Sequence, residues 1–222
     1  MTEVINAGSA SDLPLGLRER NKAEKLRRLR DAARTLFIKQ GYDETTMRSI
    51  AERADIGFGT LFTYASDKRD LLFLIFNDNL DETADAAFKH ATAKRIFLEQ
   101  LIAYFENFYR FFLPQPELSR LVLREMTFYV KGHQAEQFRD GVSRIYHHLA
   151  SLAETAQTSG TLGTSEQPVI LAQALMATFS QEIRRWIATD DPDLSKGLAR
   201  LRRMLALQIS GLQPREGALG RR

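Results

Sequence analysis

Helical periodicity runs through the chain from about Asn21 to its end, and no sustained stretch alternates apolar and polar residues as a strand does. In the first helical segment an apolar stripe recurs every three or four residues, and Gly41 follows it, where a left-handed residue often ends a helix. The prolines and the Ser159–Gly163 stretch separate further helices, which we expect over 94–113, 117–131, 134–158, 167–189 and 194–211. The pattern predicts an all-α protein.

The length of 222 residues suits a small domain joined to a larger one. Residues 1–20 contain Gly8, Pro14 and Gly16 and are expected to form a flexible arm. We expect a first domain of three helices over residues 21–68 and a larger helical domain over residues 69–222.

Positive charge is concentrated near the N-terminus. The whole chain carries a net charge of +3, whereas residues 18–69 contain 13 basic and 8 acidic residues. Such a local excess of positive charge is typical of a nucleic-acid binder, although a solvated basic helix has the same appearance. The candidates for phosphate contacts in this region are Arg18, Arg20, Lys22, Lys25, Arg27 and Arg28.

Two short helices around a tight turn are expected between Gly41 and Leu72. The first begins after Thr45 or Thr46, the turn is Asp55-Ile56-Gly57, and the second passes through residues 59–62. Asp67 then begins a fourth helix. Two short helices joined by a turn that contains glycine are typical of a helix-turn-helix, whose second helix enters the major groove of DNA.

These residues resemble the DNA-binding motif of the tetracycline-repressor (TetR) family over roughly 45 positions. The matching elements are Gly41-Tyr42, Thr45-Thr46, Ile50-Ala51, the run from Gly59 to Ala65, and Asp67-Lys68. The resemblance implies that Thr46, Thr60, Tyr64 and Lys68 contact the DNA backbone and that positions 58, 59, 62 and 63 face the groove. We therefore expect the DNA-binding residues to be Thr46, Arg48, Phe58, Gly59, Thr60, Thr63, Tyr64 and Lys68.

Several residues depart from the family pattern. Gly57 replaces a frequent Ser or Thr and Phe62 replaces the usual Tyr, so hydroxyl contacts are lost, and Ala65 replaces the usual Phe, which changes the packing of the core. Two of the expected DNA contacts also have a second interpretation. Thr46 either contacts DNA or only caps its helix, and Phe58 either enters the groove or is merely exposed.

An aromatic cluster is the clearest feature of the larger domain. Six aromatic residues fall between Tyr104 and Phe112, over an arc wide enough for one side to be core and the other to line a pocket. The resemblance implies that this domain binds a small regulatory molecule, which the cluster suggests is apolar or aromatic. The alternative is a plain aromatic core. The expected pocket residues are Tyr104, Phe108, Phe112, Met126, Tyr129, Tyr146, Met176 and Phe179.

The last two helices each carry an apolar stripe, from Ala172 to Trp186 and from Leu198 to Ile209. Such helices suit a four-helix bundle across a twofold axis, although they can also pack within one chain. We expect a homodimer that binds a palindromic operator and releases it when the small molecule binds. The alternatives are a DNA-binding helical regulator without small-molecule control, or an activator.

Several functional classes are not expected. The chain contains no cysteine, which excludes thiolate metal sites and cysteine nucleophiles, and it lacks the common hydrolase, zinc-protease and phosphate-loop motifs. We therefore expect neither an enzyme nor a metal site nor a cofactor. No apolar run is long enough to span a bilayer, so a cytoplasmic protein without a membrane partner is expected.

Overall fold

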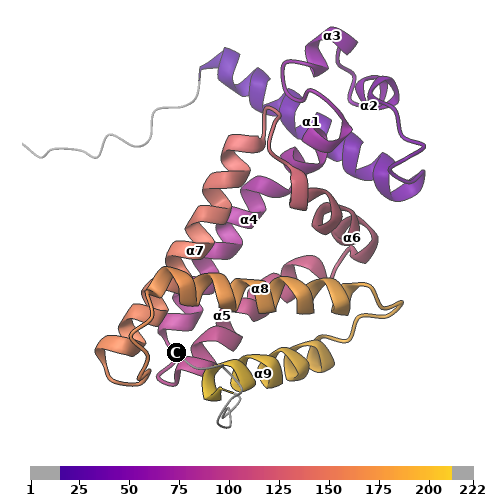
Figure 1. Ribbon diagram of the computed structural model, residues 1–222. Helices are drawn as coiled ribbons and strands as arrows, with labels where there is room; N and C mark the ends of the chain where they lie inside the picture. The colour runs from indigo at the N-terminus through magenta and orange to yellow at the C-terminus, as the bar shows by residue number, and fades with distance from the viewer. Residues whose placement is uncertain (1–15, 212–222) are drawn as a thin grey trace, which may run out of the picture. The chain divides into compact units, whose positions relative to one another are not determined.

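The computed structural model of the protein describes residues 16–211, and all of the regular structure in that range is helical. The contacts divide the chain into two units, one ending at Tyr64 and the other beginning at Ala65 (Figure 1). Because no strand occurs within residues 16–211, the all-α prediction is confirmed. The boundary between the two units therefore lies after Tyr64, a few residues before position 68, where the sequence analysis placed it.

The first unit contains α1 (Leu17–Lys39), α2 (Met47–Arg53) and α3 (Phe58–Leu61). The three helices form one small core, in which α1 contacts α2 and α2 contacts α3. Its fully enclosed members have at most 2% of their surface exposed and are Leu29, Ala33, Ile50, Ala51, Ala54 and Leu61. Gly41 follows α1 with a φ of +86°, in the left-handed region that the sequence predicted there.

The start of α1 differs from the sequence prediction. Residues 17–20 were expected to belong to a flexible arm, but they form the first turn of α1. The carboxylate of Glu19 accepts a hydrogen bond from the Gly16 amide at 3.2 Å, which caps the helix four residues before Asn21. The remainder of the predicted arm, residues 1–15, lies outside the described residues.

The second unit contains six α-helices and one short 3-10 helix among its described residues. They are α4 (Lys68–Thr92), α5 (Phe97–Phe112), α6 (Pro116–Glu125), η1 (Met126–Phe128), α7 (Ala135–Thr158), α8 (Pro168–Ile187) and α9 (Leu194–Ser210). Each overlaps a helix expected from the sequence. No helix within residues 16–211 is both long enough and apolar enough to cross a membrane.

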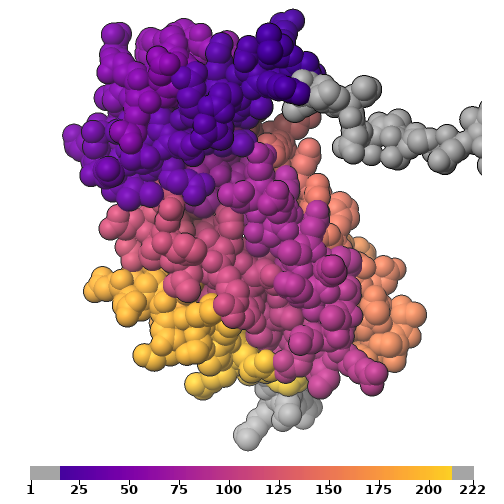
Figure 2. All heavy atoms as spheres, turned by 180° about the vertical axis from the view of Figure 1, so that it is seen from behind, coloured from indigo at the N-terminus to yellow at the C-terminus, as the bar shows by residue number. Residues whose placement is uncertain are grey.

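Helix α5 is the centre of the second unit, since α4, α7, α8 and α9 all contact it. Its aromatic residues Tyr104, Phe105, Phe108 and Tyr109 have at most 2% of their surface exposed. Seen from behind, the yellow surface of α9 adjoins the magenta and pink surface of earlier helices of this unit (Figure 2). The wide aromatic arc of α5 is therefore explained by its neighbours, which enclose it on several sides.

A buried carboxylate fixes the start of α4 to the segment that precedes α7. Asp70 accepts hydrogen bonds from the amides of Ser66, His133 and Gln134 at 2.8–2.9 Å, from the Ser66 hydroxyl at 3.0 Å, and from the Tyr129 hydroxyl. Burial alone would raise the pKa of Asp70, but the hydrogen bonds from Tyr129 and the three amides outweigh it and lower that pKa. We call Asp70, Ser66, Tyr129, His133 and Gln134 the Asp70 clasp.

The close approach in the clasp requires glycine at position 132. Gly132 has a φ of +142°, and a Cβ there would come within 2.6 Å of Asp70 Oδ1 and 2.7 Å of the Tyr129 hydroxyl oxygen. The Tyr129 ring also stacks on Phe73 of α4 with 3.8 Å between centroids. Ring and hydroxyl together hold this segment against α4.

The sequence suggested that the apolar stripes of α8 and α9 face a second copy of the chain, but Trp186 and Leu205 in these stripes do not. Trp186 has 7% of its surface exposed and Leu205 has none, because both pack inside the unit. Gly197 of α9 lies so close that a Cβ would meet Trp186 Cδ1 at 2.6 Å and Tyr109 Cε1 at 2.8 Å. The apolar residues that these two helices do expose are Val169, Ile170, Met204, Leu207 and Ile209.

Candidate DNA-binding surface and ligand pockets

Helix α2 begins at a reciprocal cap formed by Thr46 and Ser49. The Thr46 hydroxyl oxygen accepts a hydrogen bond from the Ser49 amide at 3.0 Å, and the Thr46 amide donates to Ser49 Oγ at 3.2 Å. Thr46 remains exposed at the helix start. The capping role expected for Thr46 is thus present, and its DNA contact stays a prediction.

The turn between α2 and α3 is held by an ion pair that the sequence analysis did not foresee. Asp55 has a φ of +51°, a conformation that Asp adopts more readily than most residues. Its carboxylate accepts a hydrogen bond from Arg28 Nη1 of α1 at 2.9 Å. This contact links the turn to α1.

Helix α3 presents one side to solvent because Leu61, with no exposed surface, anchors the other. The four positions that were expected to face the groove are all exposed: Phe58, Gly59, Phe62 and Thr63. A Cβ at Gly59 would meet nothing within 4 Å, so the space beyond this backbone is open.

Two exposed phenylalanines and an arginine form a strip along this side. Phe58 and Phe62 each have 41% of their surface exposed, and their rings meet edge to face at 5.1 Å. The Arg48 guanidinium of α2 lies 5.1 Å from the centre of the Phe58 ring. Arg48 and Phe58, expected as DNA-binding residues on separate helices, are thereby brought together.

The remaining expected contacts lie around this strip or follow it in sequence. Thr60 and Tyr64 are half-buried, and Thr63 donates a hydrogen bond from its hydroxyl to the Thr60 carbonyl at 2.7 Å. Lys68 belongs to the second unit, where it is the first residue of α4. Asp67 caps that helix by accepting a hydrogen bond from the Asp70 amide at 2.7 Å.

The six basic candidates of α1 fall into two groups. Arg27 binds Glu24 at 2.6 Å and Asp31 at 3.2 Å, and Arg28 binds Asp55, so both are engaged within the unit. The others are exposed along the first turns of α1 and comprise Arg18, Arg20, Lys22 and Lys25. This second group is better placed to meet an external phosphate.

The eight expected ligand-binding residues do not surround one cavity. Tyr104, Phe108 and Phe179 pack against one another, with ring centroids 5.5 and 5.7 Å apart, because α5 is enclosed by its neighbouring helices. Burial raises the pKa of Tyr104, and its hydroxyl lies 3.3 Å from His148 Nδ1. Tyr129 belongs to the Asp70 clasp, and Tyr146 and Met176 are half-buried on α7 and α8.

Phe112 and Met126, the other two, line a small cavity of about 10 Å³, which is room for about one water molecule. Asn77 is its polar member: its amide nitrogen donates to the Gln134 carbonyl at 3.1 Å, whereas its buried Oδ1 has no partner. The cavity is lined by Phe73, Phe76, Asn77, Leu80, Phe111, Phe112, Val122, Met126 and Phe138.

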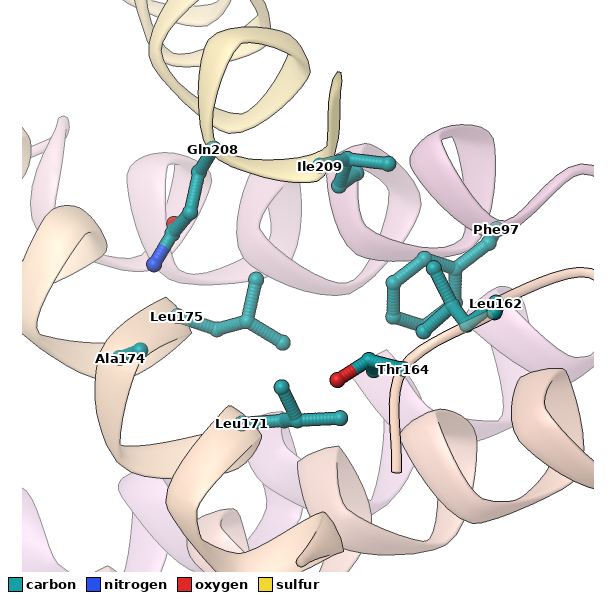
Figure 3. A pocket seen from close by; sticks show the side chains of 9 residues that line it. Phe97, Leu162, Thr164, Leu171, Ala174, Leu175, Gln208 and Ile209 are labelled. Atoms are coloured by element: carbon teal, nitrogen blue, oxygen red, sulfur yellow. The ribbon is translucent and has the colours of Figure 1, made fainter. Parts of the chain in front are cut away.

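A much larger pocket of about 420 Å³ lies between the start of α5, the segment after α7, and helices α8 and α9 (Figure 3). None of its residues was expected to bind a ligand, and no local sequence pattern links them. They are Phe97, Leu162, Gly163, Thr164, Leu171, Ala174, Leu175, Gln208 and Ile209.

Comparison with known proteins identifies the helix-turn-helix. Residues 29–75 match the sequence model of the bacterial regulatory proteins of the tetR family. Residues 29–75 therefore form a helix-turn-helix of the tetR family.

Curated relatives match about a quarter of this chain. The HTH-type transcriptional regulator HbdR of Aromatoleum sp. (strain CIB) is 40% identical over 58 residues, which cover 26% of the chain and 25% of HbdR. The HTH-type transcriptional repressor KstR of Rhodococcus jostii (strain RHA1) is 45% identical over 49 residues, 22% of the chain and 23% of KstR. The matched part thus spans about a quarter of each relative.

A solved TetR-family structure shares the fold over nearly the whole chain. Thermus thermophilus FadR, a transcriptional repressor in complex with lauroyl-CoA, superposes with a TM-score of 0.65 at 22% identity. The superposition covers 86% of this chain and 96% of FadR. The expectation of a helix-turn-helix domain followed by a larger helical domain is confirmed.

Proposed function

We propose that this TetR-family chain is a DNA-binding transcriptional repressor that acts as a homodimer on a palindromic or near-palindromic operator. The observation that carries the proposal is the solvent-facing side of α3, which the buried Leu61 anchors. In a helix-turn-helix this side enters the major groove. The names of HbdR and KstR as transcriptional regulators agree with this role and with the expectation that the chain is not an enzyme.

We assign two kinds of contact to the DNA-binding residues. Thr46, Thr60, Tyr64 and Lys68 hold phosphates, which positions the protein without reading sequence. Arg48, Phe58, Gly59 and Thr63 lie closer to the base edges, where an aromatic ring can meet thymine methyl groups. The strip of Phe58 and Phe62 favours sites rich in thymine.

Phosphate contact by Lys68 has a measurable consequence. Lys68→Ala is expected to weaken binding to all duplexes by a similar factor and to reduce the slope of log affinity against log salt by about 0.9. Lys89→Ala, at the other end of the same helix, is the matched control and should leave the slope unchanged. Fluorescence anisotropy on a genomic site found by footprinting measures both. An unchanged slope for Lys68→Ala would contradict the assignment.

Base contact by Phe58 predicts a different result. Phe58→Ala should change which sequences are preferred, by about 1–3 kcal/mol at one position, while binding to unrelated duplexes stays the same. Because Phe58 is an exposed residue, the variant should fold normally. Selection from a randomised duplex library compares the two preferences. If the variant selected the same sequences as the unaltered protein, Phe58 would be an exposed residue without a role in recognition.

We further propose that a small molecule with a large apolar part controls release from the operator. The support is the aromatic core of the second unit and the lauroyl-CoA complex of T. thermophilus FadR. Saturating lauroyl-CoA is expected to lower operator affinity about 5- to 150-fold.

The closed packing of the aromatic core favours the second candidate, a regulator without small-molecule control. A panel of acyl-CoAs and aromatic acids added to the preformed operator complex decides between the two. Release by a member of the panel at micromolar concentration supports ligand control. If operator affinity stayed constant across the panel and the protein's melting temperature did not move, the second candidate would stand.

A further inference from the structure

The 420 Å³ pocket beside α8 and α9 has the size of a small-molecule site, for which about 300–1,000 Å³ is typical. We propose that it binds an uncharged molecule with an apolar chain and a hydrogen-bond acceptor, such as a medium-chain alcohol, ester or amide. This site is separate from the aromatic core of α5 and from the helix-turn-helix. The proposal therefore stands whether or not DNA binding is confirmed.

The pocket has a fixed wall. Gln157 at the end of α7 donates two hydrogen bonds from its amide nitrogen, to the carbonyls of Thr164 at 2.9 Å and Glu166 at 2.8 Å. The Leu162 amide donates to the Ala156 carbonyl at 2.9 Å. These three bonds hold the segment after α7 in place, so a ligand does not have to order it on binding.

The floor of the pocket is apolar. Phe97 and Leu175 have only 5% and 4% of their surface exposed, and Leu171 and Leu162 also line the pocket. Figure 3 shows the side chains of Phe97, Leu171 and Leu175 directed toward one another across the space. An alkyl chain placed here would lose its contact with water and gain contacts with these side chains.

The polar side chains that line the pocket are neutral, and a neutral lining favours an uncharged ligand. The Thr164 hydroxyl is directed toward Leu171 and Leu175 (Figure 3). Its oxygen accepts a hydrogen bond from the Glu166 amide at 3.2 Å, so its hydrogen is available to a ligand. Gln208 is oriented by a hydrogen bond from Thr178 at 3.0 Å. Because no lining residue is charged, a carboxylate or ammonium in the pocket would be desolvated without a partner.

Binding of 1-octanol and of sodium octanoate to the full chain at pH 7.4 tests the proposal. Methyl NMR spectra are expected to show that octanol shifts the signals of Leu171, Leu175 and Ile209, while methyl groups elsewhere are unaffected. Octanoate has the same chain length but carries a charge, and should bind at least about tenfold more weakly. Equal binding of the two probes would contradict the neutral-ligand assignment.

Two variants locate the site. Ala174→Phe places a ring at the rim of the pocket and should abolish the octanol shifts, whereas Gln173→Phe, on the same helix but outside the lining, should preserve them. Thr164→Val keeps the shape but removes the hydroxyl, and should weaken octanol binding about threefold to tenfold. Unchanged binding in both Ala174→Phe and Thr164→Val would overturn the proposal.

A chain cut after Gly211 completes the test, because residues 212–222 follow α9 directly. Octanol should bind this shortened chain and the full chain with similar affinity. If octanol bound only the shortened chain, the C-terminal residues would occupy the pocket in the full chain, and the ligand proposal would be wrong.

Discussion

Asp70→Ala is expected to lower the free energy of unfolding of the second unit by about 3–5 kcal/mol. The substitution leaves the Tyr129 hydroxyl and the amides of His133 and Gln134 without their acceptor, and each buried donor so orphaned costs about 1–3 kcal/mol. Urea denaturation followed by circular dichroism measures the change. Asp85→Ala is the control: Asp85 is largely exposed and pairs with Arg144, so its loss should cost less than about 1 kcal/mol.

Because the pKa of Asp70 is lowered in the folded protein, the stabilisation that its carboxylate provides depends on pH. A carboxyl group whose folded pKa lies below its unfolded value stabilises the fold above the unfolded pKa, and that stabilisation is lost as the pH falls through the folded pKa. The ordinary pKa of an Asp side chain is 3.8, so the loss of this stabilisation should begin near pH 4 and continue below it. In Asp70→Asn this part of the acid dependence should disappear. A stability of Asp70→Ala within 1 kcal/mol of the unaltered protein would show that the clasp is not structural.

The combined substitution Met204→Asp with Leu207→Asp is expected to give a monomer and to lower operator affinity about 10²- to 10⁴-fold. Both side chains are exposed on α9, so the aspartates stay hydrated and the unit remains folded. A monomer engages one half-site, and the gain from two linked contacts is lost. Sedimentation and anisotropy measure mass and affinity. Trp186 and Leu205 are unsuitable for this test, because a charge at either buried position would unfold the unit.

Ile96→Asp is the matched control for the dimer experiment. Ile96 is as apolar as Leu207 and has 65% of its surface exposed, but it precedes α5 and belongs to neither α8 nor α9. It also occupies the N-cap position of α5, where aspartate is favourable. The Ile96 variant should therefore remain dimeric and bind the operator normally. A dimer that persisted in the double variant would place the interface on another surface.

Local chemistry predicted the helix-turn-helix well, because each boundary depends on residues close in sequence. Thr46 caps α2, Asp67 caps α4, and Gly41 takes a positive φ after α1. Thr63 follows the buried Leu61 by two residues, which places it on the other side of the chain, whereas the exposure of Phe58, three residues before Leu61, does not follow from helical spacing. The start of α1 was missed because Gly16 and Glu19 were interpreted as part of an arm, although a Glu three residues after a glycine is compatible with a helix start.

The second unit was harder to predict, because its features depend on contacts between distant residues. An apolar stripe shows that a helix buries one side, but not whether that side faces its own chain or a second copy, and for Trp186 and Leu205 the partner is the same chain. Likewise, the aromatic run of α5 is explained by enclosure rather than by a cavity. The large pocket joins residues from Phe97 to Ile209, and no sequence spacing could have indicated it.

The Asp70 clasp also bears on how the chain is made. Asp70 and Gln134 are separated by 64 positions, so at a synthesis rate of about 5–20 residues per second the carboxylate precedes its last partner by several seconds. During this interval it remains hydrated, and the first turn of α4 has only the local cap from Asp67. The helix-turn-helix sequence up to Tyr64 has already left the ribosome's catalytic centre by then. The start of α4 is therefore secured only late in synthesis, when the beginning of α7 is available to bury the charge.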